Sequence, residues 1–220
     1  CTTTLNQIQT KLAHTQRISQ IQLDVGDTTQ VNTAITKIEA EFGPIAILIN
    51  AAAILRLSPA LTCSDDDWLT TININLGGVF RLCRAVGQHM QARRSGVIIS
   101  VASNAAHTAR QNMAAYAASK AGISQFMRCL GLELAPYGIR CNTVSPGSTD
   151  TAMQRQLWTS PAAEEAIIKG DLNSFRLGIP LGRIASAQDI ADAVCFLASQ
   201  QARHITMQDL CVDGGATLGV

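Results

Sequence analysis

Tyr116 and Lys120 are the two residues whose types and spacing best suit acid–base chemistry. They stand four residues apart in Tyr116-Ala-Ala-Ser-Lys120, so a helix would present the phenol and the ammonium on one face. A free tyrosine has a pKa of about 10 and is a poor base at neutral pH. Because a nearby cation stabilises phenolate, we expect Lys120 to lower the pKa of Tyr116 toward the working pH.

Two further polar residues are candidates for the same site. Ser103 follows the apolar run 97–102 and precedes Tyr116 by thirteen residues, so a strand, a loop and a helix would bring its hydroxyl beside the phenol. Asn75 lies inside an apolar helical stretch, where a buried amide needs a water or a backbone carbonyl near Lys120 as partner. Each residue has a common structural role when taken alone, so the predicted site rests on the combination.

The elements that must position these residues alternate along the chain. Short apolar runs predict strands over 45–50, 97–102, 139–144 and 207–213, and helical spacing predicts helices over 28–42, 65–92, 112–135 and 187–199. Strands separated by helices imply parallel crossovers. We therefore predict an α/β fold, a doubly wound Rossmann-like parallel sheet, in one domain over 1–220.

The segment 148–181 interrupts this alternation. It contains short helical patches between a strand and the last helix. Ligands of open α/β sheets bind beyond the carboxyl ends of the strands. We predict that 148–181 forms a substrate lid within the domain.

Composition excludes several classes of function. The 220 residues are 47% hydrophobic and 15% charged, with a net charge of +1, which is typical of a globular protein. No basic stripe or long apolar run is present, so neither nucleic acid nor membrane is an expected partner. The seven cysteines are scattered with no CxxC pair, which predicts no metal site and a reducing, cytoplasmic location.

Taken together, these motifs resemble the short-chain dehydrogenase/reductase family, from about Leu23 to Val220. The resemblance rests on the YxxxK pair, Ser103, Asn50-Ala-Ala-Ala53 after a strand, Asn75-Leu-Gly-Gly78, Leu23-Asp24-Val25 and Pro146-Gly-Ser-Thr-Asp-Thr151. It implies a nicotinamide-linked hydride transfer with Tyr116 as acid–base. Lys120 would bind the nicotinamide ribose and lower the Tyr116 pKa, Ser103 would orient the substrate oxygen, and Asn75 would support a proton relay through water.

The resemblance also implies the cofactor contacts, with NAD as the expected cofactor. Asp24 and Val25 would meet the adenine, Asn50, Ala51 and Ala52 would line the adenosine ribose side, and Pro146, Gly147, Thr149 and Thr151 would surround the nicotinamide beside Tyr116 and Lys120. In this family, helices equivalent to 65–92 and 112–135 form subunit interfaces. A homo-oligomer, dimer or tetramer, is therefore expected.

Two departures from the family pattern bear on cofactor binding. Ala53 stands where the family has glycine, and no TGxxxGxG motif precedes Asp24. That motif is the turn that binds pyrophosphate at a helix N-terminus. We expect the sequence to lack the family's first βαβ unit, which would weaken NAD binding and leaves open a catalytically inert fragment.

The loops expected to face the substrate resemble particular members of the family more than others. Ser103–Arg110, Cys141–Arg155, Leu177–Ala185 and His204–Val220 look like members of the family that oxidise a carboxylated cyclohexadiene diol to 2,3-dihydroxybenzoate for catechol siderophores. A related reductase of 3-oxoacyl thioesters that uses NADPH remains the alternative.

A carboxylated substrate needs a cationic anchor in the site. Arg56 follows the strand 45–50, and His107 and Arg110 follow 97–102, so all three are expected at the correct edge of the sheet. Met153 and Gln154 would close over the ring. The alternatives are a surface position for each arginine and, for His107, a hydrogen bond within its own loop.

Overall fold

A four-stranded parallel sheet forms the centre of the computed structural model, which describes residues 17–156 and 163–219. The strands are β1 (Ile47–Asn50), β2 (Gly96–Val101), β3 (Ile139–Pro146) and β4 (Asp209–Val212), and they pair in chain order. Each pairing is parallel, with Ile47 opposite Val97 and Gly96 opposite Ile139. The predicted α/β class with a parallel sheet is confirmed, and all four predicted strands form.

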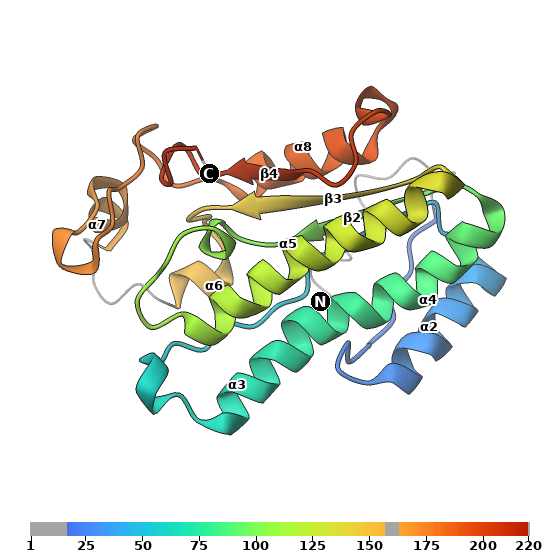
Figure 1. Ribbon diagram of the computed structural model, residues 1–220, viewed down its shortest axis with the longest axis horizontal. Coiled ribbons are helices and arrows are strands. Elements are labelled where there is room, and N and C mark those ends of the chain that lie inside the picture. Colours follow the sequence, from blue (N-terminus) through green and yellow to red (C-terminus); the bar gives the residue numbers. More distant parts are fainter. Residues whose placement is uncertain (1–16, 157–162, 220) are drawn as a thin grey trace.

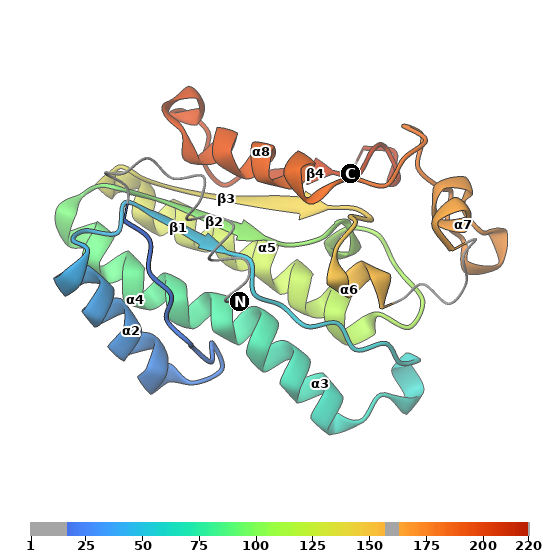
Figure 2. The ribbon, with the colours of Figure 1, turned by 180° about the vertical axis from the view of Figure 1, so that it is seen from behind.

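The helices cover both faces of this sheet (Figures 1 and 2). They are α2 (Thr28–Glu41), α3 (Asp65–Ile72), α4 (Gly78–Arg93), α5 (Ala114–Leu134), α6 (Ala152–Arg155), α7 (Ala163–Lys169) and α8 (Ala187–Ala198). Helices α2, α4 and α5 lie on one face and α8 on the other. The N-terminus of α3 is capped as the sequence predicts. The Ser64 hydroxyl accepts a hydrogen bond from the Asp67 amide, and three aspartates occupy the first turn.

The two faces bury separate apolar clusters. Successive residues of β2 point to opposite faces, so Ile98 packs with Val86 and Met127 under α4 and α5, while Ile99 packs with Val194 under α8. This arrangement explains why β2 reads as a continuous apolar run in the sequence.

Strand β1 is less covered than a central strand would be. Ile47 and Ile49 are 46% and 48% exposed, although their apolar run predicts burial on both faces. Within the described residues β1 pairs only with β2, and α8 packs on β2, β3 and β4. Among the described residues, Ile47 and Ile49 therefore have no helix packed closely over them.

The predicted helix 65–92 is interrupted once. A π turn over Asn73–Gly77 separates α3 from α4 and rotates Asn75 inward, where it is fully buried. Such turns often mark functional positions in helices. Gly78 follows because a Cβ there would approach the Val25 side chain to 2.7 Å.

The segment 148–181 begins where β3 ends, and α6 and α7 lie beyond the carboxyl ends of the strands (Figure 1). Neither helix contains a buried residue. No helix among the described residues is both long and apolar enough to cross a membrane.

Candidate active site

A cavity of about 380 Å³ opens where β1, β2 and β3 end. The residues that follow these strands line it, together with the start of α5 and part of 148–181. Most of the predicted site residues are brought together there: Ala51, Ser103, Arg110, Tyr116, Lys120, Pro146, Gly147, Thr149, Thr151, Met153 and Gln154. The position agrees with the ligand site expected of an open α/β sheet.

Ser103 and Tyr116 lie next to each other in the wall of the cavity. Ser103 follows β2 and caps a short 3-10 turn, with its hydroxyl accepting the Ala105 amide at 3.2 Å. Burial raises the pKa of Tyr116, and a hydrogen bond from Ser103 partly offsets that effect. Both hydroxyls can contact one substrate oxygen.

Lys120 lies one turn further along α5 and is 3% exposed. Its ammonium donates to the Val101 carbonyl oxygen at 2.8 Å and lies 5.6 Å from the centre of the Tyr116 ring. Burial lowers the pKa of Lys120 to about 8. The expected lowering of the Tyr116 pKa is wrong, because burial of the phenol outweighs the other effects and Lys120 points at a backbone carbonyl.

Lys120 has the donors that a bound cofactor would need. One of its three N–H groups has an acceptor among the described residues, the Val101 carbonyl, and the side chain lines the cavity. A buried ammonium left with spare donors fits the hydroxyls of a ribose. The residues present at this end therefore fit a nicotinamide nucleotide.

Asn75 joins the loop after β1 to α5. Its Oδ1 accepts the Ile54 amide at 2.8 Å, and its Nδ2 donates to the Ile54 carbonyl and the Ser119 hydroxyl, both at 3.0 Å. Ser119 in turn donates to the Tyr116 carbonyl oxygen at 2.7 Å. The expected partner was a water or a backbone carbonyl near Lys120, and the Ile54 carbonyl is such a partner, with both N–H groups of Asn75 in use. Asn75 therefore joins this loop to α5, and its part in a relay through water stays a prediction.

The residues predicted for the adenosine side form a second, smaller cavity. Val25, Asn50, Ala51 and Ala52 line a space of about 80 Å³. Asn50 donates to the Ser100 hydroxyl at 3.0 Å, and its buried Oδ1 has no hydrogen-bond partner within 17–156 and 163–219. Asp24 is outside this lining, because its carboxylate accepts the Gly26 amide at 2.7 Å and closes the turn before α2.

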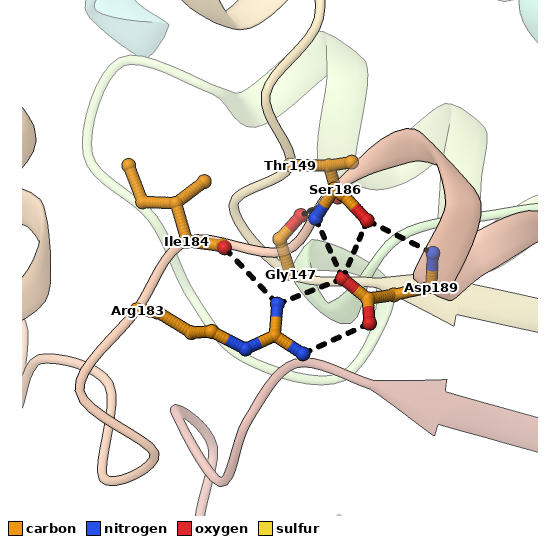
Figure 3. Close-up of polar contacts among 6 residues, drawn as sticks. All are labelled: Gly147, Thr149, Arg183, Ile184, Ser186 and Asp189. Atoms are coloured by element: carbon orange, nitrogen blue, oxygen red, sulfur yellow. Dashed lines mark hydrogen bonds and ion pairs between the residues drawn. The ribbon is translucent and has the colours of Figure 1, made fainter.

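The loop after β3 pairs with the loop before α8 through Ala185, whose carbonyl accepts the Asp150 amide at 2.8 Å and whose amide donates to the Ser148 carbonyl at 3.1 Å. Figure 3 shows the polar side-chain contacts around this junction. Thr149 donates to the Gly147 carbonyl at 3.1 Å and is bridged to Ala185. Arg183 makes a two-pronged ion pair with Asp189, with both distances 2.8 Å, and Asp189 also accepts from Ser186. These contacts hold the pKa of Asp189 well below its usual value. The Arg183–Asp189 ion pair was not predicted from the sequence.

Two predicted substrate residues do not line the cavity. Arg56 pairs with Asp66 and Asp67 in the first turn of α3, and all three are substantially exposed. His107 Nε2 lies 2.9 Å from Asp209 Oδ2 on β4, a carboxylate that also accepts from Ser124. Both predictions were based on the position of the residue after a strand. In the structure, the nearby carboxylates determine where the two side chains point.

Arg176 lines the cavity and was not predicted. It belongs to the segment 148–181, in which several cations are available and no spacing singles one out. Its position depends on how the chain after α7 turns back toward the sheet.

Comparison with known proteins agrees with this geometry. Residues 2–217 match the family model described as "Enoyl-(Acyl carrier protein) reductase". The 2,3-dihydro-2,3-dihydroxybenzoate dehydrogenases of Bacillus subtilis and Escherichia coli are 54% and 50% identical over 197 residues, which is 90% of this chain and 76% and 79% of theirs. A gluconate 5-dehydrogenase from Burkholderia cenocepacia, solved with NADP and tartrate, superposes with a TM-score of 0.83 at 35% identity, covering 90% of this chain and 74% of that one.

Proposed function

We propose that this chain, which belongs to the short-chain dehydrogenase/reductase family, oxidises 2,3-dihydro-2,3-dihydroxybenzoate to 2,3-dihydroxybenzoate with NAD. The observation that carries the proposal is one cavity lined by Ser103, Tyr116 and Lys120 at one end and by further cations at the other. The identity with two dehydrogenases of this substrate supports it.

The protein groups divide the reaction between them. Tyr116, as phenolate, accepts the proton of a ring hydroxyl, and Ser103 donates a hydrogen bond to the same oxygen. NAD, when bound, supplies the acceptor for the hydride that leaves the carbinol carbon. The carbinol C–H and O–H bonds are lost and a ketone forms, which tautomerises to the aromatic catechol. Because aromatisation is strongly favourable, it draws the oxidation forward.

The residues that would hold the cofactor come from two cavities. We assign Lys120 and Tyr116, with Pro146, Gly147, Thr149 and Thr151, to the nicotinamide end. We assign Asp24, Val25, Asn50, Ala51 and Ala52 to the adenosine end. The spare donors of Lys120 support the first assignment, and the lining of the smaller cavity by Val25, Asn50 and Ala52 supports the second.

We assign the chain to the cytoplasm, to a homo-oligomer and to catechol siderophore biosynthesis. Apolar side chains on the outer faces of α3, α4 and α5, namely Leu69, Phe80 and Leu132, are exposed and support association of copies. Sedimentation velocity of the full-length protein should give a dimer or tetramer. A monomer at micromolar concentration would contradict this assignment.

Turnover of the full-length protein tests the substrate. With NAD and the dihydrodiol, absorbance should report NADH formation, and chromatography should identify the catechol acid. NADPH with a 3-oxoacyl thioester is the parallel assay for the alternative activity. Faster turnover of the thioester, or oxidation only of alcohols that lack a carboxylate, would reject the proposed substrate.

A further inference from the structure

The charged side chains that line the main cavity are all cations. Arg110, Lys120 and Arg176 contribute to the wall, and no aspartate or glutamate is among the lining residues. Lys120 lies at the Tyr116 end and donates to a backbone carbonyl. The two arginines line a smaller adjoining cavity as well, of about 40 Å³. They therefore mark a distinct end of the site.

Arg110 and Arg176 line the same two cavities, and the charge of Arg176 acts on Arg110. Burial lowers the pKa of Arg110, and the charge of Arg176 lowers it further. Asp213 acts in the opposite direction on Arg110, but its carboxylate already accepts from Asn104, Thr217 and the Gly215 amide. Two like charges in a half-buried wall are unfavourable unless an anion joins them.

Neither arginine has an acceptor for its side chain among the described residues, and every Asp and Glu of the chain is described. Other half-buried arginines differ. Arg140 donates to the carbonyls of Leu197 and Ser199 at 2.7 and 3.1 Å, and Arg93 pairs with Glu39 at 2.8 Å. Arg110 and Arg176 are therefore left with donors that point to a ligand.

The backbone around Arg176 fixes where its side chain starts. Asp171 and Arg176 exchange two backbone hydrogen bonds of 2.9 Å, and the Asp171 carboxylate accepts a hydrogen bond from the Ser174 hydroxyl. Gly170 and Gly178 close the turn with positive φ, and a Cβ on Gly178 would lie 2.5 Å from the Ile168 carbonyl oxygen. The turn follows α7, which lies at one end of the molecule (Figure 1). From there the Arg176 side chain lines the cavity.

We propose that Arg110 and Arg176 together bind the carboxylate of the substrate, one guanidinium from the loop after β2 and one from the turn after α7. The inference rests on the proposed function and names the specificity-determining pair of that site. Planar guanidinium forks match the two oxygens of a carboxylate, and charge-assisted hydrogen bonds of this kind are strong. Anchoring the acid there leaves the ring hydroxyls free to reach Ser103 and Tyr116.

The decisive variants are Arg110→Met and Arg176→Met in the full-length protein, with Arg155→Met as matched control. Arg155 belongs to the same segment but is exposed and pairs with Asp150 outside the cavity. Each cavity variant should raise KM for the dihydrodiol acid about 10- to 100-fold, because it removes charge-assisted hydrogen bonds. KM for NAD, and turnover of the corresponding diol without a carboxylate, should stay within about twofold, as should all values for Arg155→Met.

A binding measurement separates this inference from the proposed function. Calorimetry with 2,3-dihydroxybenzoate and with catechol should show that the acid binds more tightly, and that each cavity variant removes this preference. Arg176→Lys should restore part of it. Inorganic phosphate as competitor tests whether the pair prefers a phosphate ligand: competition stronger than that of the acid would overturn the carboxylate assignment.

The outcomes distinguish the two claims. If the dihydrodiol is not oxidised but acid binding depends on both arginines, the proposed function fails and the anchor stands. If the dihydrodiol is oxidised and both variants keep the wild-type KM and the preference for the acid, the anchor is overturned and the function stands. Absence of any acid preference in the unmodified protein also overturns the anchor.

Discussion

The two sides of the cavity are built in different ways. Helix α5, which carries Tyr116 and Lys120, contains eight buried residues and runs the length of the sheet. Helices α6 and α7, on the side that carries Arg176, contain none. The acid–base groups therefore belong to the core, where packing holds them. The substrate side is held by turns and surface ion pairs, which leaves its residues free to differ without damage to the catalytic groups.

The largest effect should come from the core side. Tyr116→Phe removes only the titrating oxygen, so kcat should fall about 10²- to 10⁴-fold while the affinity for NAD is nearly unchanged. Because burial keeps the phenol protonated at neutral pH, oxidation by the unmodified protein should accelerate as the pH rises, and this acceleration should vanish in the variant. Stopped-flow and steady-state kinetics measure both. Tyr137→Phe, at the other tyrosine, is the control, and an equal loss there would contradict the assignment.

Lys120→Met should lower the activity and raise the free energy of unfolding at neutral pH. Activity should fall about 10²-fold or more, because the ammonium that we assign to the nicotinamide end of the cofactor is lost. The folded pKa of about 8 lies below the ordinary 10.5, so burial of the charged form destabilises the fold below pH 8, and stability is regained between about pH 8 and 10.5. The penalty is roughly 3 kcal/mol, and the lost hydrogen bond to Val101 offsets about 1 kcal/mol of it.

Urea unfolding should therefore give the Lys120→Met variant the higher stability at pH 7, with the difference shrinking toward pH 10.5. Lys37→Met, an exposed lysine of α2, is the matched control and should show no such trend. A variant that is less stable at pH 7 would show that the ammonium stabilises its site.

Asn75→Ala tests whether the junction of loop and helix depends on one amide. It breaks three hydrogen bonds and leaves the part-buried Ile54 amide without its Asn75 partner, so the free energy of unfolding should fall by about 2–4 kcal/mol. Because Tyr116 is then less well positioned, kcat should fall by about tenfold while its pH profile keeps its shape. Asn32→Ala on the exposed face of α2 is the control, and a stable variant with a changed pH profile would instead indicate a proton relay.

The smallest effect is expected on the substrate side. Arg183→Met breaks the pair with Asp189 at the surface (Figure 3), in the segment whose Ala185 is bridged to Thr149. Exposed ion pairs contribute little, so KM for the diol should change by less than about fivefold and the thermal midpoint hardly at all. Arg203→Met serves as control. A loss as large as that of Asn75→Ala would remove the distinction between the two sides.

The sequence was most informative where neighbours along the chain decide the outcome. The four strands and the main helices follow from period and capping, and the loops after β2 and β3 meet because parallel strands end on one edge. Ser103, Tyr116 and Lys120 converge because the loop after β2 leads directly into α5. In such elements the spacing along the sequence determines the position in space, so these three residues could be predicted from the sequence.

The tertiary structure alone decided the matters that depend on partners distant in the chain. Asp67 and Asp209 draw Arg56 and His107 away from the cavity, and the turn after α7 brings in Arg176. Spacing placed Tyr116 beside Lys120, yet burial by the surrounding core set the direction of both pKa values. Electrostatic balance sums over all groups near a site, whichever part of the chain they come from, and local spacing does not contain that sum.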